Sequence, residues 1–505
     1  MDRRYFIKLS SAITTSALLS CGSNSKKAKP KKEITNIEIA NMPDYPHIIF
    51  NGKDAKSVET INTNILIVGA GIAGLSAAVK LKDKKPILLE LGDMVGGSAI
   101  AQKINGHYYS QGAHYELDFP DNYGKETLTF LSEQNLIHKE PGNKSWSFVD
   151  KQFYIKDKLE NQSDIYGERM KELPILSAKF KELILSYNHR LPMPTTIIDS
   201  KLHDLNKISF EKLLDNLNIK ISKTFKDIIS YQMIDDYGAG ISDVSALAGL
   251  HYYACRPYYT DEVNVFSPPE GNFYFANKLL NSLDKNSVHL NSLVTKINKV
   301  ADTFEVKVFN IKKNLWIKYK TNKIIYAGQK HALKYIHPPS YDLFKNNQYA
   351  PWMAINFHLS KNIKEPFWQN DYIGEEKDFL GFVNSQTQYS NSKDTILTAY
   401  ICLPVTERSL LLKYSKNAKE PVNKIGQLIG KYLNIDLIKQ TKKAFVRLHG
   451  HGMPIPTTDY LFKDANDSRP EPKIIYAGVD NFRLPLFFEA VDSGLSAINH
   501  LTKIS

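Results

Sequence analysis

Residues 64–97 read NILIVGAGIAGLSAAVKLKDKKPILLELGDMVGG and hold the pattern of a β-α-β nucleotide-binding unit. The apolar, β-branched run 65–68 predicts a buried parallel strand, and the small-residue segment from Ile72 to about Lys82 predicts a helix. Pro86 ends that helix, and the run 87–89 predicts a second strand that leads directly to Glu90. Strand, helix and strand therefore follow one another at the spacing of a Rossmann-like fold.

Three glycines fill the turn between the first strand and the helix. Gly69 permits the tight turn, Gly71 lets the backbone approach a pyrophosphate, and Gly74 lets the helix pack closely on the strand. The amides of Ile72 and Ala73 open the helix, where a helix N-terminus favours phosphate. Glu90 lies about 20 residues beyond the first glycine, at the position of an acid that binds ribose hydroxyls. These residues predict a bound dinucleotide.

Two further segments resemble the flavin amine oxidase superfamily, which includes phytoene desaturases and protoporphyrinogen oxidases. Glu90 is followed by Leu91 and, five residues later, by the pair Gly96-Gly97. The C-terminal segment 473–494 reads KIIYAGVDNFRLPLFFEAVDSG and is similar to the family's last strand and last helix. The resemblance implies FAD as the cofactor. It also implies an α/β fold in which a Rossmann-like FAD-binding domain is interleaved with an α+β substrate domain.

Matching motifs recur between the two ends of the chain. Residues 111–114 read QGAH, where the family has a turn beside the flavin, and 269–272 read PEGN, similar to a helix start. Val294 lies on the strand that corresponds to the adenine side. The cofactor-binding residues predicted from the local unit and the resemblance are Gly69, Gly71, Ile72, Ala73, Gly74, Glu90, Leu91, Gly96, Gly97, Ser98, Gly112, Ala113, His114, Val294, Gly478, Asp480, Leu486 and Phe487.

The chain also departs from the family pattern. Ser98 follows the glycine pair where family members usually carry arginine, and Asp480 comes one place later than the usual acid. Trp352 or Met353 stands where many amine oxidases hold a lysine near flavin N5, on a strand that leads to Phe367-Trp368. The segment 238–240 has neither a third glycine nor a preceding strand, so we expect no second nucleotide domain.

The chain of 505 residues is long enough for two interleaved domains. The predicted segments are a signal peptide (1–21), a linker (22–60), FAD-binding segments (61–124, 265–335 and 446–505), a helical substrate or cap region (125–264) and a substrate-domain sheet (336–445).

The N-terminus resembles a twin-arginine export signal. Arg3-Arg4 precede Phe6 and Lys8, and a short, weakly hydrophobic stretch runs to Ser20. Cys21 ends a sequence similar to a lipobox, although Leu19 fits that motif poorly. We therefore expect export by the twin-arginine route to the periplasm, with a possible lipid anchor at Cys21. This route carries folded proteins, which suits a protein that must acquire FAD in the cytoplasm.

Composition limits the other classes of function. The net charge is +12, but residues 1–33 hold 8 Lys or Arg against 2 Asp or Glu, so half of that charge is local. The remaining body is mildly basic and lacks a nucleic-acid motif, so we expect no nucleic-acid partner. No Cys or His set has zinc or iron–sulfur spacing, so no metal is predicted. Cys255 and Cys402 are expected to be buried thiols, although the sequence leaves a disulfide between them open.

The predicted activity is oxidation of a C–N or C–C bond of a small organic electron donor by hydride transfer to flavin, with oxygen or another external acceptor. His449 and His451 are the candidate catalytic bases, since imidazole titrates near neutral pH. Asp235 and Asp236 either supply acids or belong to a turn before a helix at Ser242. Aromatic residues near His251 are candidates for the cavity wall. Two alternatives stay open: a desaturase or isomerase of a hydrophobic polyene or ring, and a non-catalytic flavin-binding envelope protein.

Overall fold

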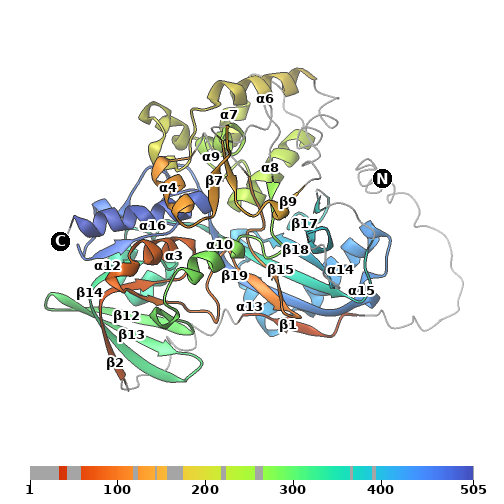
Figure 1. Ribbon diagram of the computed structural model, residues 1–505. Helices are drawn as coiled ribbons and strands as arrows, with labels where there is room; N and C mark the ends of the chain where they lie inside the picture. The colour runs from red at the N-terminus through yellow and green to blue at the C-terminus, as the bar shows by residue number, and fades with distance from the viewer. Residues whose placement is uncertain are drawn as a thin grey trace, which may run out of the picture.

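The computed structural model describes residues 33–41, 59–117, 123–142, 145–155, 174–217, 223–255, 265–363, 368–372, 374–388 and 394–503. The predicted signal peptide, its lipobox cysteine and Phe367 lie outside the described residues. Figure 1 shows two sheets side by side, with a group of helices above them.

The first sheet is seven-stranded and contains the nucleotide-binding unit (Figure 1). Segments from three distant parts of the chain meet in it, in the order β11-β3-β2-β14-β13-β12, with β20 paired to β14. Its parallel strands are β2 (Glu59–Val68), β3 (Ile87–Leu89), β11 (Val288–His289), β14 (Leu315–Tyr326) and β20 (Ile474–Tyr476). The antiparallel strands are β12 (Ser292–Val300) and β13 (Thr303–Asn310).

Alternate residues of the central strands pack on opposite faces of this sheet, as the period of two requires. Ile67 packs in a cluster with the helices on one face, and Leu66 and Val68 pack in a cluster on the other. The helices of the first face are α3 (Ile72–Lys80), α4 (Lys125–Glu133), α10 (Phe273–Asn281) and α16 (Phe487–Thr502). The short helices α11 (Leu333–Ile336) and α12 (Pro338–Tyr341) follow β14. The predicted β-α-β unit is confirmed, with the helix ending at Lys80.

The second sheet is six-stranded, in the order β1-β19-β15-β18-β17-β16. Its strands are β1 (Ile37–Ile39), β15 (Tyr349–Leu359), β16 (Gln369–Asp371), β17 (Phe379–Asn384), β18 (Thr395–Cys402) and β19 (Thr441–Pro454). Met353, Ile355 and Phe357 point to the face covered by α13 (Ser409–Lys416), α14 (Lys419–Leu433) and α15 (Leu437–Gln440). The other face carries Trp352 and Ala354. In the first sheet, residues 315–326 form one continuous strand, β14.

The helical region packs around its own core. Its helices are α6 (Pro174–Tyr187), α7 (Phe210–Asp215), α8 (Lys223–Tyr237) and α9 (Ala246–Ala254). Asp235 and Asp236 lie inside α8, and α9 starts at Ala246, where the Ser245 hydroxyl accepts from the Ala248 amide at 3.3 Å. The expectation of a turn before a helix at Ser242 is therefore wrong. Ser245 caps more effectively because it directly precedes the apolar helical run.

Short antiparallel ribbons connect these parts: β4 (Ala101–Ile104) with β5 (His107–Ser110), β7 (Ile137–Lys139) with β8 (Trp146–Phe148), and β10 (Val265–Phe266) between β6 (Glu116–Leu117) and β9 (Tyr154–Ile155).

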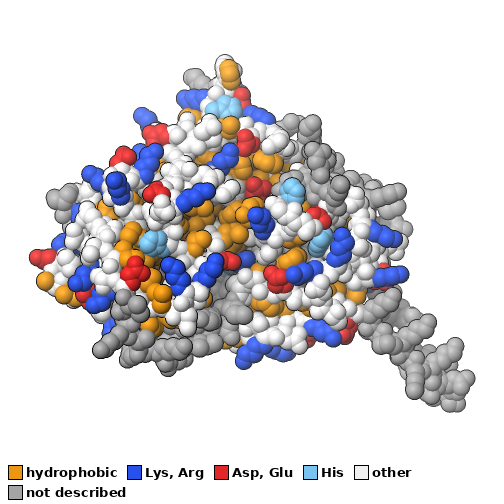
Figure 2. Space-filling model, turned by 60° about the horizontal axis from the view of Figure 1, so that its bottom comes forward, with side chains coloured by type: hydrophobic (Ala, Val, Ile, Leu, Met, Phe, Trp, Pro, Cys, Tyr) orange, Lys and Arg blue, Asp and Glu red, His pale blue; other side chains and the backbone are white. Residues whose placement is uncertain are grey.

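Charged side chains are scattered over the surface. On the face seen in Figure 2, Lys and Arg side chains surround an area with hydrophobic side chains and do not form one continuous patch. No helix in the described part of the chain combines the length and the apolar character needed to span a bilayer.

Candidate active site

The glycine turn has the geometry expected for dinucleotide binding. Gly69 has φ +98°, and a Cβ there would lie 2.7 Å from the Gly328 amide nitrogen. A Cβ on Gly74 would overlap the carbonyl oxygen of Gly69, so this glycine permits close packing of α3. A Cβ on Gly71 would meet nothing closer than the Gly97 Cα, at 3.8 Å. Neither the φ of −72° nor a contact within the protein requires a glycine at position 71. We therefore attribute this glycine to the binding of a ligand.

Two helices that pack on the first sheet, α3 and α16, lack a capping side chain at their N-termini. The first-turn amides of α3, which follows Gly71, and of α16, which follows Leu486, do not donate to a capping side chain. The first amides of a helix have no partner within the helix, and they attract negative charge. The start of α3 therefore suits a phosphate group, as the positions of Ile72 and Ala73 predict.

Glu90 lies at the end of β3, beside the same turn. Its two carboxylate oxygens accept from the amides of Ala70 and Gly92, each at 2.8 Å. Burial raises the pKa of this carboxyl group, and the two amide contacts oppose that effect. A carboxylate has further lone pairs, so Glu90 can still accept from ribose hydroxyls.

The other predicted cofactor residues fall into two groups. Gly97 and Ser98 are exposed, and Leu91 is 43% exposed, so these residues face open space beside the turn. Val294 and Phe487 have side chains buried in the two clusters of the nucleotide domain, so only their backbones are available to a ligand. Gly112 lies against the Ser98 carbonyl, and the Ala113 amide donates to that oxygen at 3.1 Å. The loop 111–113 therefore borders the segment that follows the glycine pair.

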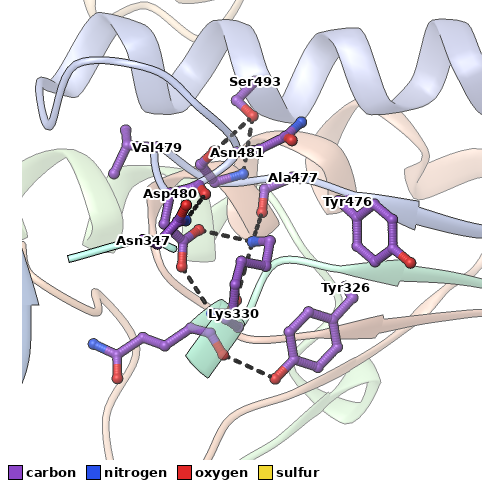
Figure 3. Close-up of polar contacts among 12 residues, drawn as sticks. Tyr326, Lys330, Asn347, Tyr476, Ala477, Val479, Asp480, Asn481 and Ser493 are labelled. Carbon is purple, nitrogen blue, oxygen red and sulfur yellow. Dashed lines mark hydrogen bonds and ion pairs between the residues drawn. The ribbon is translucent and has the colours of Figure 1, made fainter. Parts of the chain in front are cut away.

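Asp480 is held by a lysine that the sequence analysis missed (Figure 3). Lys330 Nζ lies 2.8 Å from Asp480 Oδ1 and donates to the Ala477 carbonyl at 2.6 Å. The Lys330 amide and the Tyr349 hydroxyl donate to Asp480 Oδ2, at 2.8 and 3.2 Å. Burial lowers the pKa of Lys330, and Asp480 opposes that effect. Most hydrogen-bond acceptor positions of the Asp480 carboxylate are thus occupied by protein groups. The carboxylate also links the turns after β14 and β20.

His449 faces the loop 111–113 from β19. It pairs across the sheet with Trp352, and its Nε2 lies 3.2 Å from the Gln111 carbonyl oxygen. A carbonyl only accepts, so this contact places a proton on Nε2 and leaves Nδ1 as the acceptor. Burial first, and then the charge of Arg447, lower the pKa of His449 to about 4. The imidazole is therefore neutral at pH 7.

His451 lies in a different environment from His449. Its ring stacks on that of His331, with centroids 3.5 Å apart, and Tyr349 contacts both rings edge-on. Gln329 donates to the His451 carbonyl at 2.6 Å. The register of β15 and β19 shifts between Ala350 and Trp352, so the strand bulges where the two histidines diverge. The structure thus gives His449 and His451 different partners and does not bring them together in one place.

An aromatic cluster lies on the face of the second sheet that carries Trp352. His114 stacks on Tyr400 with centroids 4.8 Å apart, and it also contacts Tyr115 and Trp368. Burial lowers the pKa of His114 to about 4, so this ring is also neutral at pH 7. The side chain of His114 thus lies against the aromatic face of the second sheet.

Helix α8 packs on this aromatic face, and the Tyr231 hydroxyl donates to the Leu380 carbonyl at 2.6 Å. His251 and its neighbouring tyrosines lie instead in the core of the helical region, so their prediction as cavity wall is wrong. They face inward because every residue of α9 is buried. Cys255 and Cys402 are buried in separate clusters and are not joined by a disulfide.

The missed residues left weak signals in the sequence. Lys330 follows Ala327-Gly328, a second Ala-Gly pair at the end of a strand, and Arg447 interrupts the apolar run 444–448. A charge within a strand that is otherwise buried indicates a specific partner. Tyr400 gave no local signal, because its contact with His114 depends on the pairing of distant strands.

Comparison with known proteins agrees with this geometry. Residues 67–133 match the family model described as an NAD(P)-binding Rossmann-like domain. Putrescine oxidase bound to putrescine has a TM-score of 0.57 at 14% identity, over 88% of this chain and all of that chain. A protein assigned as a protoporphyrinogen oxidase, from Exiguobacterium sp. 255-15, has a TM-score of 0.53 at 13% identity, over 89% of this chain and all of its own. The chain has the flavin amine oxidase fold.

A curated relative supports the same assignment over a short stretch. The chloroplastic 15-cis-phytoene desaturase of Glycine max is 52% identical over 54 residues, which is 10% of each chain. The chain therefore matches only about a tenth of this relative's length. The predicted fold class is confirmed by the structural neighbours, which cover most of the chain.

Proposed function

We propose that the protein is an FAD-dependent oxidoreductase that oxidises a C–N or C–C bond of a small organic donor. The observation that carries the proposal is the site at Gly71, a turn with room above it, next to the uncapped start of α3 and the carboxylate of Glu90. Loop 111–113 connects this site directly to the aromatic face of the second sheet. A dinucleotide and an organic donor can thus bind on either side of one loop.

The residues present fit FAD. The amides of α3 would hold the diphosphate and Glu90 the ribose hydroxyls, in a cradle that a Cβ on Gly71 would fill. When bound, FAD supplies an electron acceptor that takes two electrons from the donor as a hydride. The protein then has to position the donor and exclude water.

The aromatic face supports the second half of the proposal. Trp352, His114, Tyr400 and Trp368 offer flat apolar surfaces against which a small donor can be oriented, and α8 shields this face from water. Trp352 or Met353 stands in the place of the amine oxidase lysine, and neither an indole nor a thioether can act as a base. Any proton from the donor would pass to Nδ1 of neutral His449 or to solvent.

A desaturase or isomerase of a hydrophobic polyene or ring is the second candidate. The short match to a phytoene desaturase and the apolar character of the aromatic face favour it. A non-catalytic flavin-binding role in the cell envelope is the third, and it predicts flavin without turnover.

We also propose that the protein is exported by the twin-arginine route and held at the periplasmic side of the membrane through Cys21. The support is the sequence alone: Arg3-Arg4, Phe6 and Lys8 before a short apolar stretch. The electron acceptor would then be oxygen or another external acceptor available in that compartment.

Anaerobic titration of the purified, FAD-loaded protein tests the proposed activity. Primary amines, cyclic amines and a hydrophobic polyene are added in turn while the flavin absorbance near 450 nm is followed. Bleaching by an amine supports amine oxidation, and bleaching by the polyene supports the desaturase. A protein that binds FAD but is bleached by none of these donors would favour the non-catalytic role. A protein that takes up no FAD contradicts the proposal.

A further inference from the structure

Arg447 is a buried cation on β19, where this strand lies beside the loop after β5. It lies on β19, two residues from His449 on the same face, and its side chain is 7% exposed. Its Nε donates to Gln111 Oε1 at 2.8 Å, and Gln111 Nε2 donates in turn to the Phe445 carbonyl at 3.3 Å. Gln111 therefore fixes the direction of the guanidinium through a neutral contact.

A second buried arginine shows what Arg447 lacks. Arg483 is 4% exposed, and its Nη1 lies 2.5 Å from Asp492 Oδ2 and 3.6 Å from Glu489 Oε2. Within the described part of the chain, no carboxylate forms an ion pair with Arg447, whose side chain contacts the neutral Gln111 instead. Asp93 is the acid whose charge acts on it from farther away. A guanidinium is costly to bury without a counter-charge, because it stays protonated.

The surroundings of Arg447 belong to the proposed cofactor and donor sites. Gln111 precedes Gly112 and Ala113, and its amide donates to the Ile100 carbonyl at 2.9 Å. Gln111 thus links Arg447 to segment 98–100, which begins where the related family usually carries its arginine. Ser98 stands in that place here, and its hydroxyl donates to the Gly452 carbonyl of β19 at 3.0 Å.

We propose that Arg447 is an anion-binding residue whose guanidinium holds an oxyanion: a phosphate of the dinucleotide or a carboxylate of the donor. The inference rests on the proposed function for the identity of these two sources. A planar guanidinium suits both, because its parallel N–H groups match two oxygens of a phosphate or a carboxylate. The charge that the family places after its glycine pair is supplied here from β19.

The test compares Arg447→Met with Arg190→Met, which removes an exposed arginine and the same charge. Isothermal titration calorimetry measures the affinities for ADP, FAD and riboflavin and tests whether the oxyanion is a phosphate of the dinucleotide. Benzoate is also added to the FAD-loaded protein, and the shift of the flavin absorption band is recorded. This titration tests whether the oxyanion is a carboxylate of the donor. Circular dichroism and thermal unfolding establish that each variant is folded.

A phosphate source predicts that Arg447→Met weakens ADP and FAD binding by about 30-fold or more, while riboflavin binding is unchanged. A carboxylate source predicts unchanged ADP binding and loss of the benzoate-induced shift. The inference is overturned if ADP affinity stays within about twofold of wild type and the benzoate response is the same in both proteins, or if Arg190→Met produces the same losses.

A second variant keeps the inference testable if Arg447→Met does not fold. Gln111→Glu gives Arg447 a carboxylate partner in the protein, so it should compete with the bound oxyanion and lower its affinity while the fold is kept. Unchanged ADP and benzoate responses in Gln111→Glu would contradict the inference. The ADP titration needs no flavin. A wild-type protein that binds ADP but not FAD would therefore contradict the proposed function and leave the inference about Arg447 standing.

Discussion

Lys330 Nζ lies 2.8 Å from Asp480 Oδ1, and this buried ion pair joins two turns that are 150 residues apart in the chain. Both turns follow parallel strands of the nucleotide domain, β14 and β20, at the edge where ligands bind in open α/β sheets. Lys330 is fully buried, so the pair is shielded from water and from salt. The position of Asp480, a predicted cofactor residue, therefore depends on Lys330.

Breaking this pair is expected to destabilise the protein strongly. Lys330→Met and Asp480→Asn should each lower the free energy of unfolding by about 3–5 kcal/mol, because each leaves a buried charge or polar group without its partner. The double variant should recover part of that loss. Urea unfolding measures these values, with Lys334→Met as the exposed control. Additive losses in the double variant would show that the pair is not coupled.

The glycine turn offers a matched pair of substitutions. Gly71→Val should fold normally, since a Cβ there meets nothing within 3.8 Å, but it should abolish FAD binding by filling the cradle. Gly74→Val should instead disrupt the fold, because its Cβ overlaps the Gly69 carbonyl. The ratio of flavin to protein absorbance, together with circular dichroism, separates the two effects. Full flavin content in Gly71→Val would show that the site is misplaced.

His449 is expected to be a poor general base at neutral pH. With a pKa lowered to about 4, it is neutral but weakly basic, so His449→Gln should keep the flavin reduction rate within about tenfold of wild type. His451→Gln, measured in parallel by stopped flow, tests the other candidate. A loss of about 10²-fold or more in either variant would assign that histidine the role of base.

Stability should fall in acid because of two buried histidines. His114 and His449 have folded-state pKa values lowered to about 4, whereas an unfolded histidine titrates near 6.5. The unfolded state therefore binds protons first, and each group removes up to about 3 kcal/mol of stability as the pH falls from 6.5 to 4.

Glu489 changes the pH dependence of stability in the opposite direction to the two histidines. Burial raises the pKa of Glu489 to about 7, so this group removes stability as the pH rises from 4.5 towards 7. His449→Gln should flatten the acid limb of a plot of stability against pH, and Glu489→Gln should steepen the net rise. His107→Gln, at an exposed position, is the control. A profile unchanged by His449→Gln would contradict the neutral state assigned to this ring.

Export is testable without the structure. Replacing Arg3 and Arg4 with lysine should leave the protein in the cytoplasm, because the twin-arginine route requires the paired arginines. Cys21→Ala should separately release an exported protein from the membrane. Cell fractionation with a fused reporter measures both, and unchanged localisation of the double lysine variant would rule out this route.

Some features of the site depend on short stretches of sequence. The glycine turn, α3, β3 and Glu90 were predicted with nearly the observed boundaries, because each follows from residues adjacent in the chain. Backbone conformation at Gly69 and the packing of Gly74 on Gly69 are local properties. The residue at Ser98 was likewise recognisable as a departure, since its place relative to the glycine pair is fixed by spacing.

Other features exist only after distant strands have paired. Lys330 meets Asp480 because β20 pairs with β14, and Arg447 meets Gln111 across 336 residues because β19 lies beside the loop after β5. The lowered pKa of His449 likewise arises from burial and from Arg447, neither of which its neighbours in sequence specify. The sequence alone determined the nucleotide-binding turn, because local backbone preferences fix it. Only the tertiary structure decided the charge and protonation of the site, because these depend on burial and on partners brought from elsewhere in the chain.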